Sequence, residues 1–307
     1  MIIDNFKGEL KKDEKMSNHT TWKVGGVAKY LALPYDEVDV ELAVSYCLKE
    51  SIRYCIIGNG SNVLFTDDNF DGMVIKTTGG LKEKKTLFYQ NDTVISYFSA
   101  GNMMGDILNF SLRHGLAGLE FLSGIPATFG GVLKMNAGAF NSEIKDIIEW
   151  INFYSPEVGF ISKRRNELSF SYRRLDVPKD WIILGGAVRL TKDKREAIQE
   201  RINNNLKKRK ETQPLNEPTC GSVFKNPKGD YAGRIIEELG LKGFQVGGAK
   251  ISEKHANFIV NTGRATAKDI LTLIEMIKQK VWLKKELLLE EEVVIMNKNT
   301  GSKVSIV

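Results

Sequence analysis

The chain has 307 residues, of which 42% are hydrophobic and 27% are charged. These proportions are typical of a globular protein and exclude a chain that is disordered over most of its length. The length predicts two domains, or one large domain with a smaller one. The formal net charge is +6 without a zinc-finger, homeodomain or RNA-binding motif, so an anionic small molecule is a better candidate partner than nucleic acid.

The cysteines and the N-terminus indicate the compartment. Cys47, Cys55 and Cys220 have neither a metal-binding spacing nor a disulfide framework, which favours a reducing compartment and no metal. Residues 1–16 are largely charged and unlike a signal peptide. No run approaches the ~18 apolar residues of a membrane span. We therefore expect a cytoplasmic protein with no membrane partner.

In the first part of the chain, strand-like and helix-like segments alternate. Apolar residues at helical spacing predict a helix over 36–50, which a short buried strand over 53–57 follows. A second helix is predicted over 102–114, with Asn102 as its N-cap and Gly115 as its stop. Further strands are predicted over 73–76, 93–100, 150–154, 160–162, 181–184 and 187–190.

The second part of the chain is richer in helix and in charge. Helices are predicted over 194–210, over 231–239 and from a capping box at 266–269 to about 287. The densest basic run, 207–210, is interpreted as a solvated helix face. Strands are predicted over 257–260 and in a final hairpin of 292–297 and 303–307 across 299–301. The sum is an α+β protein, with domains expected over 1–192 and 193–307.

The first segment that suggests a ligand directly follows the strand over 53–57. Gly58 and Gly60 allow a sharp turn and leave bare backbone N–H groups for an anion, and Ser61 and Asn62 add side-chain donors. No third glycine opens a helix, so this is not a Rossmann fingerprint. A tight turn after a strand is the alternative interpretation.

Two further segments combine glycines with small residues. The stretch 124–140 is long and carries few bulky side chains, which would let a flat ligand and its diphosphate lie against the backbone. Close packing of loops is the alternative. A glycine pair lies in 20–28. The candidate cofactor-binding residues of the three segments are Gly25, Gly26, Gly58, Asn59, Gly60, Ser61, Asn62, Gly124, Pro126, Thr128, Gly130, Gly131, Asn136, Ala137 and Gly138.

The order and wording of these segments resemble the FAD-binding domain of the UDP-N-acetylenolpyruvoylglucosamine reductases (MurB), in the flavoprotein superfamily that includes vanillyl-alcohol oxidase. The resemblance continues in 221–227, 233–243 and 252–261. It covers about residues 17 to 295 and is similar to the shorter, type II form. It implies a two-part FAD-binding domain of the PCMH type, followed by a smaller α+β substrate domain.

The resemblance also implies an activity. The family reduces UDP-N-acetylglucosamine enolpyruvate to UDP-N-acetylmuramate for peptidoglycan and cell wall synthesis, with NADPH as the hydride donor and non-covalent FAD. A hydride from flavin N5 would reach the vinyl carbon. We expect a monomer. Two alternatives stay open: a flavin oxidase or dehydrogenase of the same superfamily with another substrate, and a catalytically silent flavin- or UDP-sugar-binding protein.

By the same resemblance, three residues would carry the chemistry. Ser222 would donate the proton, Arg173 would hold the substrate carboxylate and Glu292 would assist at the enolate. Without the resemblance, these residues would be interpreted as a turn serine, a surface arginine and part of a solvated acidic run. Substrate contacts are expected from Tyr172, Lys225 and Asn226, with Lys225 as a candidate for the diphosphate.

Some positions depart from the family pattern. Phe129, Lys134 and Val294 stand where other residue types are usual, and Phe129 is expected to press on the flavin pocket. His255 could be a general acid or base, but we favour a structural role because no partner for a dyad is evident. His19 and His114 are interpreted as surface or capping residues.

Overall fold

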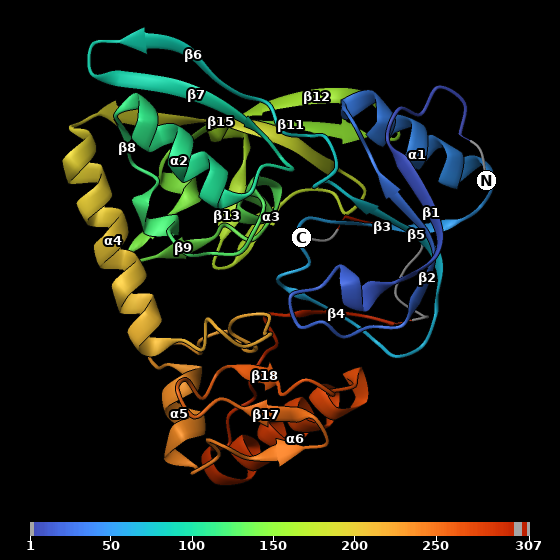
Figure 1. Cartoon of the computed structure of the whole chain (residues 1–307), viewed down its shortest axis with the longest axis vertical. Coiled ribbons are helices and arrows are strands. Elements are labelled where there is room, and N and C mark those ends of the chain that lie inside the picture. Colours follow the sequence, from blue (N-terminus) through green and yellow to red (C-terminus); the bar gives the residue numbers. More distant parts are fainter. Residues whose placement is uncertain (1–2, 298–302, 306–307) are drawn as a thin grey trace.

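The computed structural model describes residues 3–297 and 303–305. The structure confirms the predicted α+β class. Three parts are visible in Figure 1: a part around β1, β2, β3 and β5, a part around β7, β11 and β15, and a C-terminal part around α5 and α6. No helix of the described residues is both long and apolar enough to cross a membrane. The described residues also contain no cluster suited to a metal ion.

The first part is a five-stranded sheet in the order β1-β2-β5-β3-β20. Only the β1–β2 pair is antiparallel. The predicted helix is α1 (Glu37–Lys49), and its N-cap Asp36 accepts a hydrogen bond from Asp39 N–H. The strands are β1 (Glu9–Lys15), β2 (Val27–Leu33), β3 (Arg53–Ile57), β5 (Phe70–Lys76) and β20 (Lys303–Ser305).

The second part is a sheet with the path β12-β11-β15-β7-β6, all antiparallel, with β8 paired to β15. The strands predicted over 181–184 and 187–190 are one strand, β15, which a paired partner on each side keeps continuous. The bounds are β6 (Lys84–Gln90), β7 (Thr93–Ser99), β8 (Leu116–Ala117), β11 (Ile148–Ser155), β12 (Gly159–Arg164) and β15 (Ile182–Lys192).

Two helices pack against this second sheet (Figure 1). They are α2 (Met104–His114) and α3 (Phe129–Lys134). Gly115 ends α2 in the left-handed conformation, as predicted, but Met103 and not Asn102 is its N-cap. The side-chain amide of Asn102 instead donates to the carbonyls of Glu83 and Ser99. The helix therefore begins one residue later than predicted.

Short hairpins and single turns complete the first two parts. The hairpins pair β9 with β10 and β13 with β14. The bounds are β9 (Gly138–Ala139), β10 (Ser142–Glu143), β13 (Ser169–Ser171), β14 (Arg174–Asp176), η1 (Met16–Asn18), η2 (Glu120–Leu122), η3 (Ile144–Asp146) and η4 (Arg165–Glu167).

The C-terminal part packs a three-stranded sheet against two helices. The capping box predicted for its long helix is confirmed, because Thr266 and Asp269 each accept the other's backbone N–H. The bounds are α5 (Ala232–Glu238), β16 (Gln245–Val246), β17 (Ala249–Ile251), β18 (Ile259–Asn261) and α6 (Ala267–Lys285).

The predicted final hairpin is wrong. The strand β19 (Val294–Met296) pairs in parallel with β4 (Val63–Phe65), and β20 pairs in parallel with β3. Both partners lie more than 200 residues earlier in the chain, and a local pattern carries no information about them. The turn over 299–301 lies outside the described residues.

Several contacts join the C-terminal part to the rest. The helix α4 (Arg195–Thr212) contacts α2 and η2 and runs down one side of the molecule (Figure 1). Trp22, from the N-terminal segment, is fully buried in the C-terminal core, and its indole donates to Ile259 O. Asp67 accepts the N–H groups of Ala267 and Lys268 at the start of α6. These contacts hold the C-terminal part against the other two parts.

Candidate active site

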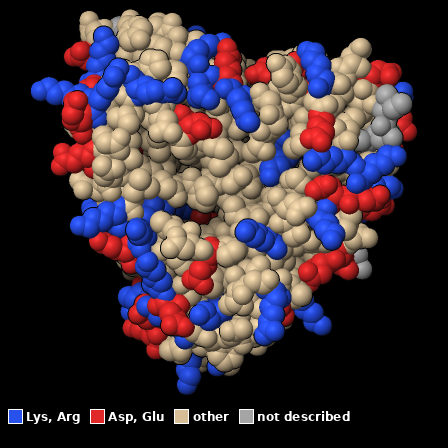
Figure 2. All heavy atoms as spheres, viewed as in Figure 1, with Lys and Arg blue, Asp and Glu red and all other residues tan. Residues whose placement is uncertain are grey.

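A cavity of about 710 Å³ lies where the three parts meet. In the view of Figure 2, a hollow opens in the middle of the face, and Lys and Arg side chains lie on its α4 side. The predicted site residues that line the cavity are Ser61, Asn62, Gly124, Pro126, Gly131, Ala137, Gly138, Arg173, Ser222 and Glu292. Segments that are distant in the sequence thus contribute to one space.

The first glycine loop forms one wall. At Gly60 the backbone is left-handed (φ 72°), and a Cβ atom there would lie 2.1 Å from the carbonyl oxygen of His19, so only glycine fits. The Asn59 amide donates to Pro126 O at 2.8 Å and ties this loop to the second one. Ser61 and Asn62, which follow, face the cavity.

The second glycine loop continues that wall. Gly124 is left-handed (φ 77°), and a Cβ there would approach the Leu206 side chain of α4 to 3.0 Å. Thr128 caps α3 by accepting Gly131 N–H. A small space of about 20 Å³ beside the main cavity is lined by Gly58, Thr128, Gly130 and Gly131, among others. Part of the segment 124–140 lines these two spaces. Close packing of loops, the alternative interpretation, therefore applies only to the rest of the segment.

Arg173 enters the cavity from the tip of the β13–β14 hairpin. Its backbone is left-handed (φ 58°), a conformation that costs a non-glycine residue ~1–2 kcal/mol and is common at functional sites. The side chain is 22% exposed, and its Nε lies 3.2 Å from Oε1 of Glu292. The contact is an ion pair, and the buried Nε–H has no hydrogen-bond partner among the described residues. The terminal nitrogens of the guanidinium also donate to no described residue, so they are the donors that remain for a ligand.

Glu292 is fixed through its backbone. Its N–H donates to Val223 O at 2.8 Å, and its carbonyl accepts from the Asn62 amide at 3.1 Å. The side chain is only 16% exposed. Burial raises the pKa of its carboxyl group, and the nearby Arg173 offsets this in part. The group can therefore be protonated at a higher pH than an exposed glutamate.

Ser222 lies on the C-terminal wall of the same cavity. Gly221 before it is left-handed (φ 87°), and the Ser222 backbone bridges Phe258. Within the described part of the chain, the Ser222 hydroxyl makes no hydrogen bond, so it is available to a bound molecule. Cys220 also lines the cavity, and burial raises the pKa of its thiol well above the usual value, so it is a thiol and not a thiolate.

Several predicted cofactor contacts do not line either space. Gly25 packs against Phe65 and Met16, and Gly26 packs against the backbone of 67–68. Asn136 is fully buried, and its amide donates to Glu143 and to Ser171 O. With Asn59 and Gly60, described above, these residues shape the loops rather than face the cavity.

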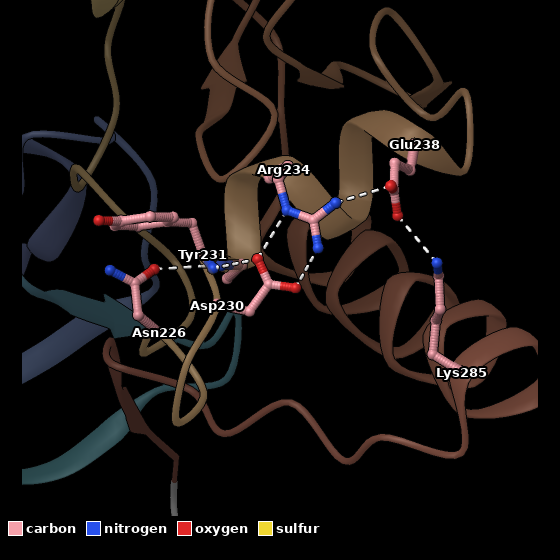
Figure 3. A network of polar contacts seen from close by, with 7 residues as sticks. Asn226, Asp230, Tyr231, Arg234, Glu238 and Lys285 are labelled. Atoms are coloured by element: carbon pink, nitrogen blue, oxygen red, sulfur yellow. Dashed lines mark hydrogen bonds and ion pairs between the residues drawn. The ribbon is translucent and has the colours of Figure 1, made fainter.

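The three predicted substrate residues also lie away from the cavity lining. Lys225 pairs with Glu290 at 2.8 Å. Asn226 accepts the backbone N–H of Ala232 at the start of α5, beside a chain of contacts that leads through Asp230, Arg234 and Glu238 to Lys285 (Figure 3). Tyr172 is 45% exposed, with the Arg173 guanidinium 5.0 Å from its ring centre.

Arg209 is the main residue that the sequence prediction missed. It lines the cavity from the end of α4, so the solvated-face interpretation of 207–210 is wrong for this residue. Its Nε is buried without a hydrogen-bond partner among the described residues, and NH1 donates to Gln213. Burial, and then repulsion by Arg173, lower the pKa of Arg209. The guanidinium therefore lacks a counter-anion that a ligand could supply.

The positions that depart from the family pattern have separate explanations. Phe129 is fully buried and packs edge-on against Phe98 at 5.6 Å, and it lines neither the cavity nor the small space. Lys134 lines the small space, and burial lowers its pKa. His255 accepts the N–H of Asn257 at 3.2 Å, and burial lowers its pKa, which supports a structural role.

His19 is mostly buried and not a surface residue. It pairs with Glu14 at 2.9 Å, and its other ring nitrogen lies 3.5 Å from Lys76 Nζ. The Nδ1 atom of His114 lies 2.8 Å from the carbonyl oxygen of Phe110, in the same helix, as expected of a capping residue.

The residues present fit a dinucleotide such as FAD. Bare glycine backbone and the polar side chains of Ser61 and Asn62 form one wall, and the orphaned Arg209 Nε–H provides a cation for an anionic group. Ser222, Glu292 and Arg173 line the same cavity, and the Asn62 amide donates to the Glu292 carbonyl. A flat cofactor held by the glycine loops would therefore lie beside these reactive side chains.

Family models match two stretches of the chain, and both stretches contribute residues to the cavity. Residues 213–296 match the family model of the C-terminal domain of UDP-N-acetylenolpyruvoylglucosamine reductase. Residues 28–157 match that of an FAD binding domain, which confirms FAD as the predicted cofactor.

Whole-length relatives carry the same description. The UDP-N-acetylenolpyruvoylglucosamine reductase of Caldanaerobacter subterraneus subsp. tengcongensis is 39% identical, with 92% of this chain and 93% of the relative covered. That of Heliobacterium modesticaldum is 37% identical, over 98% and 95%. The crystal structure of the Thermus caldophilus enzyme superposes with a TM-score of 0.79 at 34% identity, over 94% of this chain and 99% of that one.

Proposed function

Because the chain belongs to the family of UDP-N-acetylenolpyruvoylglucosamine reductases, we propose that it reduces UDP-N-acetylglucosamine enolpyruvate to UDP-N-acetylmuramate with NADPH as reductant. The product is a peptidoglycan precursor. The observation that carries the proposal is the meeting of Arg173, Ser222 and Glu292 in a cavity that the glycine loops also line. A silent binding protein would have no need of all three.

Ser61, Asn62, Gly124 and Gly131 would hold the cofactor without a covalent bond. When bound, FAD would supply hydride-transfer chemistry, with NADPH as the source of the electrons. The protein must then place the vinyl carbon of the substrate near that wall, exclude water and manage the charge that develops. These tasks would fall to Arg173, Ser222 and Glu292.

Arg173 would bind the substrate carboxylate. Its planar guanidinium stays charged and can donate two parallel hydrogen bonds to a carboxylate. The charge that develops on hydride addition spreads into this carboxylate, so the same contact strengthens as the reaction proceeds. The left-handed turn and the neighbouring Glu292 support the position of the side chain.

Ser222 would donate the proton to the neighbouring carbon. A hydroxyl is a weak acid, so it needs positive field nearby. Lys225 pairs with Glu290 and does not line the cavity, although its charge still reaches Glu292. Arg173 and Arg209 both line it and can provide the field.

Glu292 would assist at the enolate carbon. Its raised pKa allows a protonated fraction that can donate a hydrogen bond to the developing oxyanion. The adjacent Arg173 keeps the ionised form accessible once the product has formed. The cytoplasmic location, the monomeric state and the division into 1–192 and 193–307 stay predictions.

A turnover assay tests the function. The purified protein is mixed with NADPH and the enolpyruvyl sugar, and NADPH oxidation, oxygen uptake and UDP-N-acetylmuramate are measured together. We expect one UDP-N-acetylmuramate per NADPH and no oxygen requirement. Oxygen consumption without this product would favour the oxidase alternative, and no NADPH oxidation would favour the silent binding protein.

A further inference from the structure

Lys23 lies in a tight turn between the first glycine loop and the C-terminal part. The Thr20 hydroxyl donates to Val24 O at 2.8 Å, and Lys23 N–H donates to Thr20 O at 3.1 Å. Trp22 and Val24, on either side, are buried in the C-terminal core. The turn is therefore anchored at both ends and holds Lys23 in one place.

The backbone of Lys23 is left-handed, with φ of 57°. Glycine and asparagine adopt this conformation far more readily than lysine does. A turn that served only to reverse the chain would accept either of them. The presence of lysine at such a position indicates that its side chain has a use.

The side chain of Lys23 is exposed and lines the cavity. Within the described part of the chain, its ammonium group makes no ion pair and no hydrogen bond. Thr21, Ser61 and Ser222 line the same space. The group is thus an uncompensated cation, carried by a fixed backbone turn, in a cavity that hydroxyl groups also line.

The carboxylates of the cavity do not neutralise this cation. Glu292 pairs with Arg173 at 3.2 Å, and the exposed Glu217 forms no ion pair with Lys23 or Arg209 in the structure. Among the described residues, Arg209 donates a hydrogen bond to Gln213 alone. The cavity therefore has an excess of positive charge that suits an anionic ligand of more than one charge.

We propose that Lys23 binds the diphosphate group of a nucleotide in this cavity. The inference rests on the proposed function, which brings two diphosphates to the same space, that of FAD and that of the UDP-sugar. Both offer the oxygens that an ammonium group binds as a point charge. Lys225, the diphosphate candidate of the sequence analysis, is instead engaged by Glu290.

Lys23→Asn and Lys23→Arg test the proposal, with Lys228→Asn as the matched control on an exposed loop. Two ligands are measured on the flavin-bound protein. FAD retention is followed by the flavin fluorescence released on dilution. UDP binding is measured by calorimetry with FAD in excess. Asparagine tolerates the left-handed turn, so the melting temperature of Lys23→Asn should not fall.

We expect Lys23→Asn to weaken one of the two ligands about tenfold, the size of one charge-assisted hydrogen bond, with a smaller effect at high salt. Lys23→Arg should stay within about threefold, and Lys228→Asn should match the wild type. Weaker UDP binding alone identifies the substrate diphosphate, and weaker FAD retention alone identifies the cofactor. Unchanged values for both ligands overturn the proposal.

The same data separate this inference from the proposed function. If the wild type binds no UDP but Lys23→Asn loses FAD, the role of Lys23 stands and the reductase proposal fails. If the wild type binds both ligands and Lys23→Asn binds them equally well, Lys23 has no such role and the reductase proposal is untouched.

Discussion

Nε of Arg173 lies 3.2 Å from Oε1 of Glu292 in a cavity wall that also contains Ser222. The arginine comes from a hairpin of the second part, and the glutamate comes from the segment just before β19. Each is only partly exposed, and the charge of Arg173 offsets part of the rise that burial causes in the pKa of Glu292. Their pairing couples the proposed carboxylate site to the proposed enolate site.

Replacement of Arg173 by lysine keeps the charge but removes the planar pair of donors. We expect Arg173→Lys to lower the rate of substrate reduction by about 10²–10³, the usual loss for one transition-state donor, and Arg173→Gln to lower it further. Flavin reduction by NADPH should change little. Stopped-flow absorbance of the flavin measures both half-reactions. Equal loss in both would assign Arg173 to the flavin instead of the substrate.

Ser222→Ala should spare flavin reduction and slow the step in which the substrate reoxidises the flavin. Removal of a positioned acid typically costs 10²–10⁴ in rate. Ser222→Cys supplies a control of similar size that retains an ionisable proton. Wild-type rates of both half-reactions in Ser222→Ala would show that another group is the acid.

Arg209→Met should weaken FAD binding roughly tenfold to a hundredfold, because the buried guanidinium then no longer meets an anionic group. Without flavin, the same variant should be no less stable than the wild type, since burial of an unpaired charge is unfavourable. Lys208→Met, one residue earlier and exposed, is the control. Flavin fluorescence titration and thermal unfolding measure the two effects. Unchanged FAD affinity would contradict the assignment.

Trp22→Ala should destabilise the C-terminal part. The side chain is fully buried and donates to Ile259 O, and loss of a buried tryptophan costs about 3–5 kcal/mol. Trp282→Ala, at a side chain that is 48% exposed, should cost far less. Urea unfolding followed by circular dichroism compares them. Equal losses would mean that the N-terminal turn does not stabilise the C-terminal core.

Stability should fall as the pH drops below about 6.5. Burial lowers the pKa of His255 and of His19 in the folded protein, so the unfolded chain binds more protons in this range. Their contribution is complete above the unfolded pKa and is lost as the pH falls through the folded values. His255→Gln should flatten this pH dependence in part. Urea midpoints between pH 5 and 8 test it, and an unaltered slope in the variant would contradict it.

Local motifs could be predicted from the sequence because their partners are close in the chain. Asp36 caps α1 through Asp39, the capping box of Thr266 and Asp269 opens α6, and Gly115 ends α2. Each depends on contacts within a few residues. The glycine loops could also be predicted as tight turns, although the contacts that require glycine at Gly60 and surround Gly124 come from His19 and Leu206, which are distant in the chain.

The remaining features depend on distant contacts. The strand β19 pairs with β4, more than 200 residues away. Its amino acids are equally compatible with a local hairpin, so the sequence pattern predicted the wrong partner. Arg209 lies among lysines in a charged helix, and only the position of α4 beside Gly124 turns it inward. Arg173, Ser222 and Glu292 required the resemblance, because nothing local distinguishes them from surface residues.

The most direct test of the central claim is a single anaerobic mixing experiment. The purified protein is reduced with one equivalent of NADPH until the flavin absorbance is bleached, and UDP-N-acetylglucosamine enolpyruvate is then added without oxygen. We predict that the oxidised flavin spectrum returns with one UDP-N-acetylmuramate formed per flavin. A flavin that stays reduced until air is admitted would contradict the reductase assignment.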